Sequence, residues 1–412
     1  MPLPPLAIIE PNAASAGGHF GDPLVALASA ARAEGRLVAV VALDGTAAST
    51  RADLHASGAE VYQRPGRGEL AAWLLLAAGL ACRRLAALAR RTLPRWRLPN
   101  QLILVGRCLT EAASLRVARV ALAPHQPVAV LLTASEALHG LVALLAGTPH
   151  LRIVHEVYTT EAAVVRLLGW AGRSGERKVL VICTTSAVRH DLSRRFPRLS
   201  TDVRPFTLLD PEGYLDPKQR QAARAAFGLA HADLAVSLVG GWWWYKDIDT
   251  VQRALAQLRN ELHLIVAGSP VDHTVLDRMA TTPGVRLHVL ARDLDFDEVR
   301  QVYAASDATL VSRRPGVAKE SGLVMDAARL GVPLVVSDHD PVLTGLLAGE
   351  AWVRLFRAGD PADLAATLDA LADHPPGRPT VADARRMGMM TAAQAVAYFT
   401  THQQTLTPAG TL

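Results

Sequence analysis

Two acidic side chains flank a glycine in the segment KESGLVMDAARLGVP, residues 319–333. Glu320 precedes Gly322, and Asp326 follows within a helix-like stretch over residues 324–330 that stops at Gly-Val-Pro. Glycine lets a ligand approach the backbone, and the first turn of a helix exposes N–H groups that attract anions. Carboxylates accept hydrogen bonds from vicinal hydroxyl groups. The segment therefore predicts a ligand that carries both hydroxyl groups and an anion.

A lysine follows two glycines in VGGWWWYKDIDTVQRAL, residues 239–255. Gly240 and Gly241 end an apolar, strand-like run, and Lys246 stands just before a helix signal that begins at Asp247. An ammonium group at such a junction suits a diphosphate, although a solvated surface lysine has the same pattern. For the three tryptophans, packing within the loop is favoured over a platform for a base or sugar ring.

Two arginines, Arg313 and Arg314, lie just upstream of the acidic segment. They can add positive charge for a phosphate, or they can equally be surface residues. Acids for hydroxyl groups, together with a helix N-terminus and Lys246 for phosphates, match a nucleotide sugar.

Two segments of the N-terminal half can also contact a ligand. In the loop PNAASAGGHFGDP, residues 11–23, Gly17 and Gly18 allow close approach of a bulky or anionic group, unless the loop is only a flexible connection. His155 and Glu156 fall at the end of a predicted strand, where a histidine can donate to a sugar hydroxyl or phosphate oxygen. A hydrogen-bonded structural histidine is the alternative.

A dinucleotide fingerprint competes for the same glycine loop, because Asp44 closes the second predicted strand where a ribose-binding acid would lie. The glycines run G-G-x-x-G after a long loop, however, and the fingerprint requires G-x-G-x-x-G in a tight turn. The pattern therefore disfavours an NAD enzyme.

Short apolar runs alternate with alanine- and leucine-rich stretches of helical length along the N-terminal half. The runs that read as buried strands are residues 6–10, 37–43, 128–133, 152–157 and 179–185. This alternation predicts parallel strands joined by crossover helices, such as the helical segment 22–35, and hence a doubly wound α/β domain.

The pattern restarts in the C-terminal half. The second series of strand-like runs covers residues 234–241, 263–268, 285–290, 308–312 and 333–338. The segment 204–220 between the two series is rich in proline and turn residues, so the domain boundary is expected there. Ligands bind at the carboxyl ends of parallel strands, which makes a cleft between the two halves the expected site.

Bulk properties limit the class of protein. A chain of 412 residues that is 50% hydrophobic can bury two cores. The formal net charge of +5 and the pI near 9.4 suit an anionic partner, but only four of the 43 basic residues are lysine, which looks like the codon bias of a GC-rich genome. Three scattered cysteines favour neither a zinc site nor a disulfide framework. The scattered cysteines fit a reducing cytoplasm best, and the N-terminus does not read as a signal peptide.

A basic apolar segment, residues 69–99, interrupts the N-terminal series of strands. Leucine and tryptophan alternate there with six arginines: Arg83, Arg84, Arg90, Arg91, Arg95 and Arg97. This composition is typical of a helix at an anionic membrane surface, and an internal amphipathic helix with solvated arginines is the alternative. Its longest apolar run, residues 70–82, gives about 20 Å of helix, too short to cross a bilayer core of about 30 Å.

The order of these segments resembles the GT-B glycosyltransferases, in particular the large retaining family 4. The matching pieces are Gly17-Gly18-His19, the strand-end His155, the two glycines before Lys246, LIVAGS (264–269), VYAASDATLVSRR (302–314) and SGLVMDAARLGVPLVVSD (321–338). The resemblance covers about residues 6 to 375. It implies two Rossmann-like doubly wound domains that face each other across a cleft.

Domain boundaries follow from this resemblance. They are an acceptor-side domain over residues 1–206 that contains the 69–99 segment, a donor-side domain over 207–384, and a C-terminal helix with tail over 385–412 that crosses back to the first domain.

The resemblance also implies roles for individual residues. His155 contacts the donor sugar, Lys246 pairs with the diphosphate, and Asp326 holds the nucleotide ribose. The implied catalytic residues are His155, Lys246 and Glu320, and the implied donor-binding residues are Gly17, Gly18, His19, Gly240, Gly241, Arg313, Arg314, Ser321, Gly322, Leu323 and Asp326.

The acidic motif departs from the family pattern. Ala318 stands where the first acid of the E-x7-E motif belongs, so Glu320 must replace it with only five residues before Asp326. An arginine that the family places before the lysine is missing, and Arg313 or Arg314 can supply its charge.

The implied activity is transfer of a sugar from a nucleotide-diphosphate sugar to a glycan or lipid-linked acceptor, with retention and without a metal or other cofactor. Nucleic acid is not an expected partner, and the protein is expected in the cytoplasm of a bacterium, with possible peripheral attachment to the inner face of the membrane. Two alternatives stay open: a non-catalytic GT-B subunit, which the altered acidic motif would explain, and a GT-B epimerase that turns over the nucleotide sugar without an acceptor.

Overall fold

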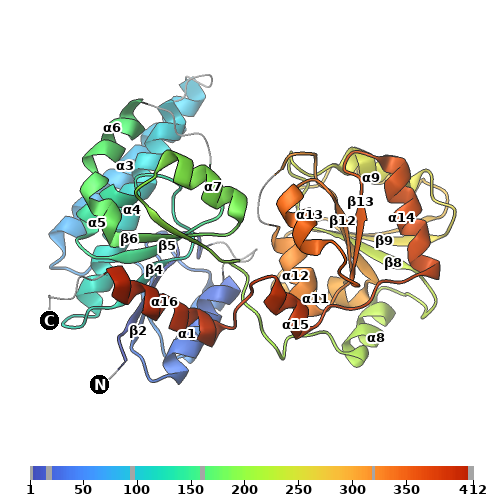
Figure 1. Cartoon of the computed structure of the whole chain (residues 1–412), viewed down its shortest axis with the longest axis horizontal. Coiled ribbons are helices and arrows are strands. Elements are labelled where there is room, and N and C mark those ends of the chain that lie inside the picture. The colour runs from blue at the N-terminus through green and yellow to red at the C-terminus, as the bar shows by residue number, and fades with distance from the viewer. Residues whose placement is uncertain (1–2, 15–20, 93–97, 158–162, 318–320, 407–412) are drawn as a thin grey trace. The chain divides into compact units, whose positions relative to one another are not determined.

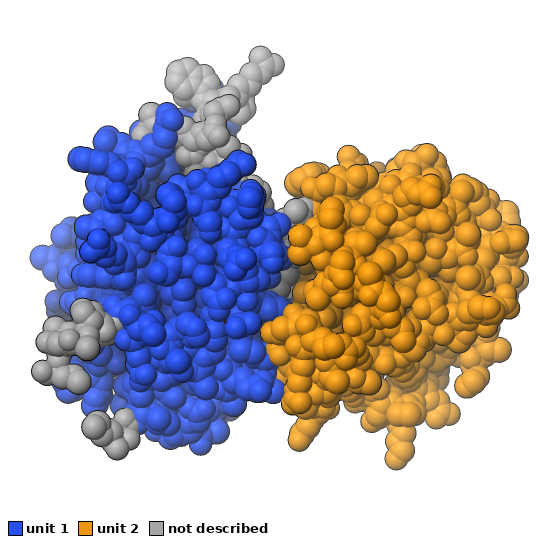
Figure 2. All heavy atoms as spheres, viewed as in Figure 1, with its two compact units in different colours: residues 1–208, 390–412 blue, residues 209–389 orange. Residues whose placement is uncertain are grey.

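The computed structural model of the protein describes residues 3–14, 21–92, 98–157, 163–317 and 321–406. The chain divides into two compact units, unit 1 with residues 1–208 and 390–412 and unit 2 with residues 209–389 (Figures 1 and 2). The division after Leu208 falls within the proline-rich segment in which the sequence analysis placed the boundary.

Unit 1 is built on seven parallel strands in its described part, in the order β3-β2-β1-β4-β5-β6-β7. Its elements are β1 (Leu6–Ile9), α1 (Gly21–Ala33), β2 (Val38–Val41), α2 (Ala48–Ala56), β3 (Glu60–Tyr62), α3 (Leu70–Thr92), α4 (Leu98–Ala121), β4 (Val128–Leu131), α5 (His139–Ala146), β5 (His150–Val154), α6 (Ala163–Ala171), the 3₁₀ helix η1 (Arg173–Lys178), β6 (Val179–Cys183), α7 (Ser186–Arg195), β7 (Ser200–Val203) and α16 (Ala392–Leu406).

Helices cover both faces of this sheet (Figure 1). Alternate residues of a strand point to opposite faces, so Leu6 and Ile8 of β1 join a core with α1 and α16, whereas Ala7 and Ile9 join a core with α4, α5 and α7. All four residues are fully buried, which is typical of a central parallel strand.

The basic apolar segment forms the long helix α3 and leads into a second long helix, α4, and the two helices lie side by side (Figure 1). They approach closely at a pair of glycines: a Cβ atom on Gly79 of α3 would lie 2.9 Å from the carbonyl oxygen of Gly106 of α4. The apolar run 70–82 continues as helix to Thr92, so α3 has 23 residues, and by length and composition it could cross a membrane. Only 22% of its most apolar window is buried inside unit 1.

Unit 2 has a parallel sheet with the order β10-β9-β8-β11-β12-β13. Its elements are α8 (Pro217–Ala226), β8 (Ala235–Val239), α9 (Ile248–Leu255), β9 (Leu262–Ala267), α10 (His273–Ala280), β10 (Val285–Leu290), α11 (Phe296–Ala305), β11 (Ala308–Val311), α12 (Gly322–Leu330), β12 (Leu334–Ser337), α13 (Pro341–Leu347), β13 (Val353–Phe356), α14 (Pro361–Asp373) and α15 (Val381–Arg386). The helical C-terminal segment is thus divided, with α15 in unit 2 and α16 in unit 1.

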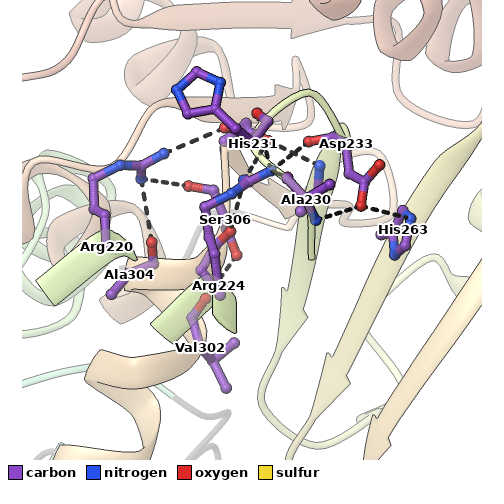
Figure 3. A network of polar contacts seen from close by, with 12 residues as sticks. Arg220, Arg224, Ala230, His231, Asp233, His263, Val302, Ala304 and Ser306 are labelled. Carbon is purple, nitrogen blue, oxygen red and sulfur yellow. Dashed lines mark hydrogen bonds and ion pairs between the residues drawn. The ribbon is translucent and has the colours of Figure 1, made fainter. Parts of the chain in front are cut away.

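A network of arginines on α8 joins the elements at the amino edge of the sheet of unit 2 (Figure 3). Arg220 and Arg224 both form ion pairs with Asp307, which also accepts a hydrogen bond from the backbone N–H of Ala235 at the start of β8. The same guanidinium groups donate to carbonyl groups at the end of α11, including that of Ser306. The N–H donors of both guanidinium groups are bound by backbone carbonyls and by the Asp307 carboxylate. We therefore interpret the network as a stabilising part of the fold and not as a ligand site.

Candidate functional site

The predicted donor-binding residues of unit 2 gather at the carboxyl edge of its sheet. Strands β8, β11 and β12 are neighbours in this sheet and run parallel, so their carboxyl ends meet at one edge. Lys246 follows β8, Arg313 follows β11, and α12 begins at Gly322 in the connection from β11 to β12.

The structure explains why both positions directly after β8 are glycine. Gly240 has a positive φ of 82°, a conformation that L side chains rarely adopt. At Gly241 a Cβ atom would lie 2.2 Å from the carbonyl oxygen of Ser269, so no side chain fits between the two strand ends. Trp243 and Trp244 are mostly exposed, whereas Trp242 packs against the core of unit 2. Packing within the loop therefore explains only Trp242.

Lys246 is buried, with 8% of its surface exposed. Its Nζ donates to the carbonyl oxygens of Val239 at 2.6 Å and Gly240 at 2.8 Å. Burial, with a smaller contribution from the charge of Arg313, lowers the pKa of Lys246 to about 7. An ammonium group has three N–H donors, and two of them go to carbonyls. Among the described residues the third has no partner, so it can donate to an anion.

Arg313 lies beside this lysine. The two residues form an antiparallel backbone bridge, and the backbone N–H of Arg314 donates to the carbonyl of Tyr245 at 3.0 Å. The guanidinium of Arg313 is 5.3 Å from the centre of the Tyr245 ring, and Arg313 is 4% exposed. Arg314 is exposed. Of the two predicted arginines, the structure therefore brings only Arg313 into the site.

The start of α12 supplies uncharged hydrogen-bond donors to the site. Ser321 is its N-cap residue, but its hydroxyl makes no capping bond. In the described part of the chain, this buried Oγ has no hydrogen-bond partner. The side chain of Leu323 lies against Gly240. The first-turn N–H groups of α12 and the Ser321 hydroxyl can therefore donate to a phosphate.

Asp326 lies on the buried face of α12, with 1% of its surface exposed. Its Oδ1 accepts from Nε of Arg329 at 2.9 Å, and the two residues form an ion pair. This pair competes with the predicted role of Asp326 in holding a ribose, because a ribose hydroxyl must share the carboxylate with Arg329.

His155 lies just past the end of β5 in unit 1. Its Nε2 is 3.0 Å from the carbonyl oxygen of Leu132, and its ring packs edge-on against Phe206 with 4.6 Å between ring centroids. The geometry includes the contacts of a structural histidine, which the sequence analysis kept as the alternative. The predicted residues Gly17, Gly18, His19 and Glu320 lie outside the described residues.

Sequence reasoning missed Glu10, which follows β1 directly. Its Oε1 accepts from the backbone N–H of Asn12 at 2.7 Å and from the Thr133 hydroxyl, whereas its buried Oε2 has no partner among the described residues. Burial raises the pKa of Glu10 to about 7, against smaller opposing effects of these hydrogen bonds and of His155 and Arg107. The signal in the sequence was an acid that ends the apolar run LAIIE.

His339, two residues past β12, was missed as well. It is 2% exposed, and its Nδ1 lies 2.8 Å from the carbonyl oxygen of Ser337. The signal was a histidine between two aspartates directly after the apolar run PLVVS. Among the described residues there is no group of three or more His, Cys, Asp or Glu side chains that could hold a metal ion.

No protein-family model matches the sequence, and a search of the curated proteins gives no match. Solved structures do match over almost the whole chain. A glycosyltransferase from Rickettsia africae is 10% identical, with a TM-score of 0.63 over 98% of this chain and 100% of that chain. HepE from Anabaena in complex with UDP-glucose is 14% identical, with a TM-score of 0.55 over 97% of each chain.

WaaG, a glycosyltransferase involved in lipopolysaccharide biosynthesis, is 13% identical, with a TM-score of 0.56 over 98% of this chain and 100% of that chain. At such identities the likeness establishes the fold. The chain thus has the two-domain α/β fold of the GT-B glycosyltransferases, as its order of sequence segments predicts.

Proposed function

We propose that this protein is a glycosyltransferase that moves a sugar from a nucleotide-diphosphate sugar to a glycan or lipid-linked acceptor, with retention and without a metal. The observation that carries the proposal is the pair of buried cations, Lys246 and Arg313, at the carboxyl edge of the unit 2 sheet. Within the described residues, no carboxylate pairs with the Lys246 ammonium. A bound diphosphate would compensate the charge of this ammonium, and this would offset the cost of burying it.

The solved neighbours support the same ligand class. HepE has been crystallised with UDP, with UDP and glucose, and with UDP-glucose. For this chain, the diphosphate would accept from the free N–H of Lys246, from Arg313, and from the N–H groups of α12 with the Ser321 hydroxyl.

In the proposed reaction, the bond between the anomeric carbon and the diphosphate oxygen breaks while the acceptor oxygen attacks from the same face. The acceptor proton passes to the departing phosphate oxygen. Lys246 and Arg313 stabilise the negative charge that grows on the diphosphate as this bond breaks. Their contribution is therefore larger in the transition state than in the ground state.

A thermal-shift screen of the full chain against nucleoside diphosphates and their sugars, including UDP-glucose, ADP-glucose and GDP-mannose, tests the donor. A ligand that binds the native state raises the melting temperature by mass action. Turnover of the best ligand, measured with and without a chelator, then tests the metal-free chemistry. If no compound of the panel stabilises the protein, the proposal is wrong.

The first prediction concerns Lys246→Ala. It should lower kcat on the best donor by about 100-fold or more while donor affinity changes less, because the ammonium acts mainly on the transition state. The matched control is Lys218→Ala, which removes an exposed lysine of α8 and should leave kcat unchanged. Normal turnover in Lys246→Ala would instead favour a non-catalytic binding protein. Turnover of the donor that yields an epimeric nucleotide sugar without any acceptor would favour the epimerase.

Contact with an anionic membrane surface is the second part of the proposal. The face of α3 that points away from α4 exposes the side chains Leu70, Trp73, Leu74, Leu85 and Leu88, and the exposed basic residues of this face include Arg84 and Arg91. Apolar side chains beside arginines suit the boundary between headgroups and acyl chains. We therefore propose that the protein is cytoplasmic and binds peripherally to the membrane surface, where a lipid-linked acceptor would lie.

A further inference from the structure

A third basic side chain, His339, belongs to the same edge of the sheet as Lys246 and Arg313. The backbone of Lys246 forms a bridge with that of Arg313, and the backbone N–H of Arg313 donates to Oγ of Ser337 at 3.0 Å. The same Oγ lies 2.9 Å from Nδ1 of His339. A continuous set of short contacts therefore connects the three basic residues across the neighbouring strands β8, β11 and β12.

The contacts of His339 define its tautomer. A carbonyl oxygen can only accept a hydrogen bond, so the Nδ1 that lies 2.8 Å from the Ser337 carbonyl must carry a hydrogen. In the neutral ring, Nε2 then has a lone pair and no hydrogen. This Nε2 is buried and has no hydrogen-bond partner in the described part of the chain. A buried nitrogen without a partner costs free energy unless a ligand meets it.

The surroundings of His339 keep it neutral in the absence of a ligand. Burial, followed by the positive charge of Arg313, lowers the pKa of His339 to about 4. The hydrogen bond to the Ser337 carbonyl opposes this shift, as do Asp340 and Asp338. However, Asp338 accepts from the backbone N–H of Ala358 and Asp340 accepts from that of Val342. An added anion beside Arg313 would reverse the balance and favour the imidazolium form.

We propose that His339 is a third cationic member of the diphosphate site and that it takes up a proton from solvent when the donor binds. The proton goes to Nε2, which then donates an N–H to a phosphate oxygen, while Nδ1 keeps its bond to the Ser337 carbonyl. When the nucleotide leaves, the proton returns to solvent. This inference rests on the proposed function, because it assigns the diphosphate of that donor as the anion.

Calorimetry of UDP-glucose binding to the full chain tests the inference. The diphosphate of a sugar nucleotide has no group that titrates near neutral pH, so any proton uptake belongs to the protein. Binding heats at about pH 6 in two buffers of different ionisation enthalpy give the number of protons taken up. The wild type should take up close to one proton. Its affinity should fall about tenfold for each unit of rising pH over the range in which the free histidine is neutral and the bound one is charged.

Matched variants separate His339 from the other groups. His339→Gln should abolish uptake at about pH 6 and weaken binding about tenfold or more, whereas the exposed His273→Gln should change neither. Lys246, whose pKa is about 7, is already mostly charged at about pH 6, so Lys246→Arg should keep the uptake.

The outcomes are distinguishable. If His339→Gln weakens binding but leaves proton uptake unchanged, the histidine has a structural role and the inference is wrong; it is also wrong if both quantities are unchanged. If UDP-glucose, ADP-glucose and GDP-mannose all fail to bind the wild type, the proposed function itself has failed.

Discussion

Glu10 and Lys246 are ionisable side chains buried at strand ends, one in each unit. Burial moves the pKa of each to about 7, upward for the carboxyl and downward for the ammonium. Neither has an oppositely charged partner in direct contact among the described residues, so each lowers the stability of the native state wherever it is charged. Such groups are common at functional sites, because there a ligand supplies the missing partner.

Glu10→Gln should make unit 1 more stable at high pH. The folded-state pKa of Glu10 is raised from 4.5 to about 7, so the native state binds the proton more tightly, and stability is lost as the pH rises through this interval. Glutamine does not titrate. The variant should therefore gain on the order of 3 kcal/mol over the wild type at about pH 8 and much less at about pH 5.

Urea unfolding of wild type and variant at these two pH values measures the difference. Asp53→Asn, which neutralises an exposed acid of α2, is the control and should show no such pH dependence. Equal effects of Glu10→Gln at both pH values would show that this carboxyl is charged and adequately solvated in the native state.

At the scale of elements, α3 combines two faces that serve different purposes. One face carries Ala72, Leu76, Gly79 and Ala86, which are buried, and Gly79 lets α4 approach closely. The opposite face is rich in exposed leucine. Packing against α4 stabilises this helix within unit 1. The exposed apolar face remains available to contact a lipid surface.

Leu74→Glu should weaken binding to anionic vesicles without unfolding the protein, because Leu74 is 62% exposed and its replacement adds a negative charge to the surface that meets the lipid. Co-sedimentation with phosphatidylglycerol-containing vesicles at low salt, compared with neutral vesicles, measures this. Val342→Glu, on α13 of unit 2, is the matched control with 51% exposure. If the wild-type protein does not bind anionic vesicles, the membrane part of the proposal is wrong. The proposed transferase activity would not be affected by that result.

The whole molecule consists of two units that each have their own sheet with buried cores on both faces. The residues assigned to the diphosphate, Lys246, Arg313, Ser321 and His339, all belong to unit 2. Ligand binding therefore acts first on unit 2, and its effect on local stability should be concentrated there.

Hydrogen exchange with and without saturating UDP should show added protection at the carboxyl ends of β8, β11 and β12 and in the first turn of α12. The core strands β1 and β4 of unit 1 should exchange at unchanged rates. Equal protection of both units, or none at the ends of these three strands, would contradict the assignment of the diphosphate to this edge.

The sequence by itself determined the class of fold. All ten predicted strands are present within a few residues, because central parallel strands are buried on both faces and read as continuous apolar runs. Three strands were not predicted: β3 (EVY), β7 (STDV) and β13 (VRLF). Each is at an edge of its sheet, where one side of the strand has no neighbour and polar residues interrupt the apolar pattern.

Only the tertiary structure decided which polar residues share a site. The sequence suggested Lys246 and Arg313, but their adjacency depends on the pairing of β8 with β11, a contact between residues far apart in the chain. It gave no reason to separate Arg313 from Arg314, or to prefer His339 over other histidines. Burial, the direction of a ring nitrogen and the charge of a neighbour decide these roles, and all three arise only when the strands have assembled into the sheet.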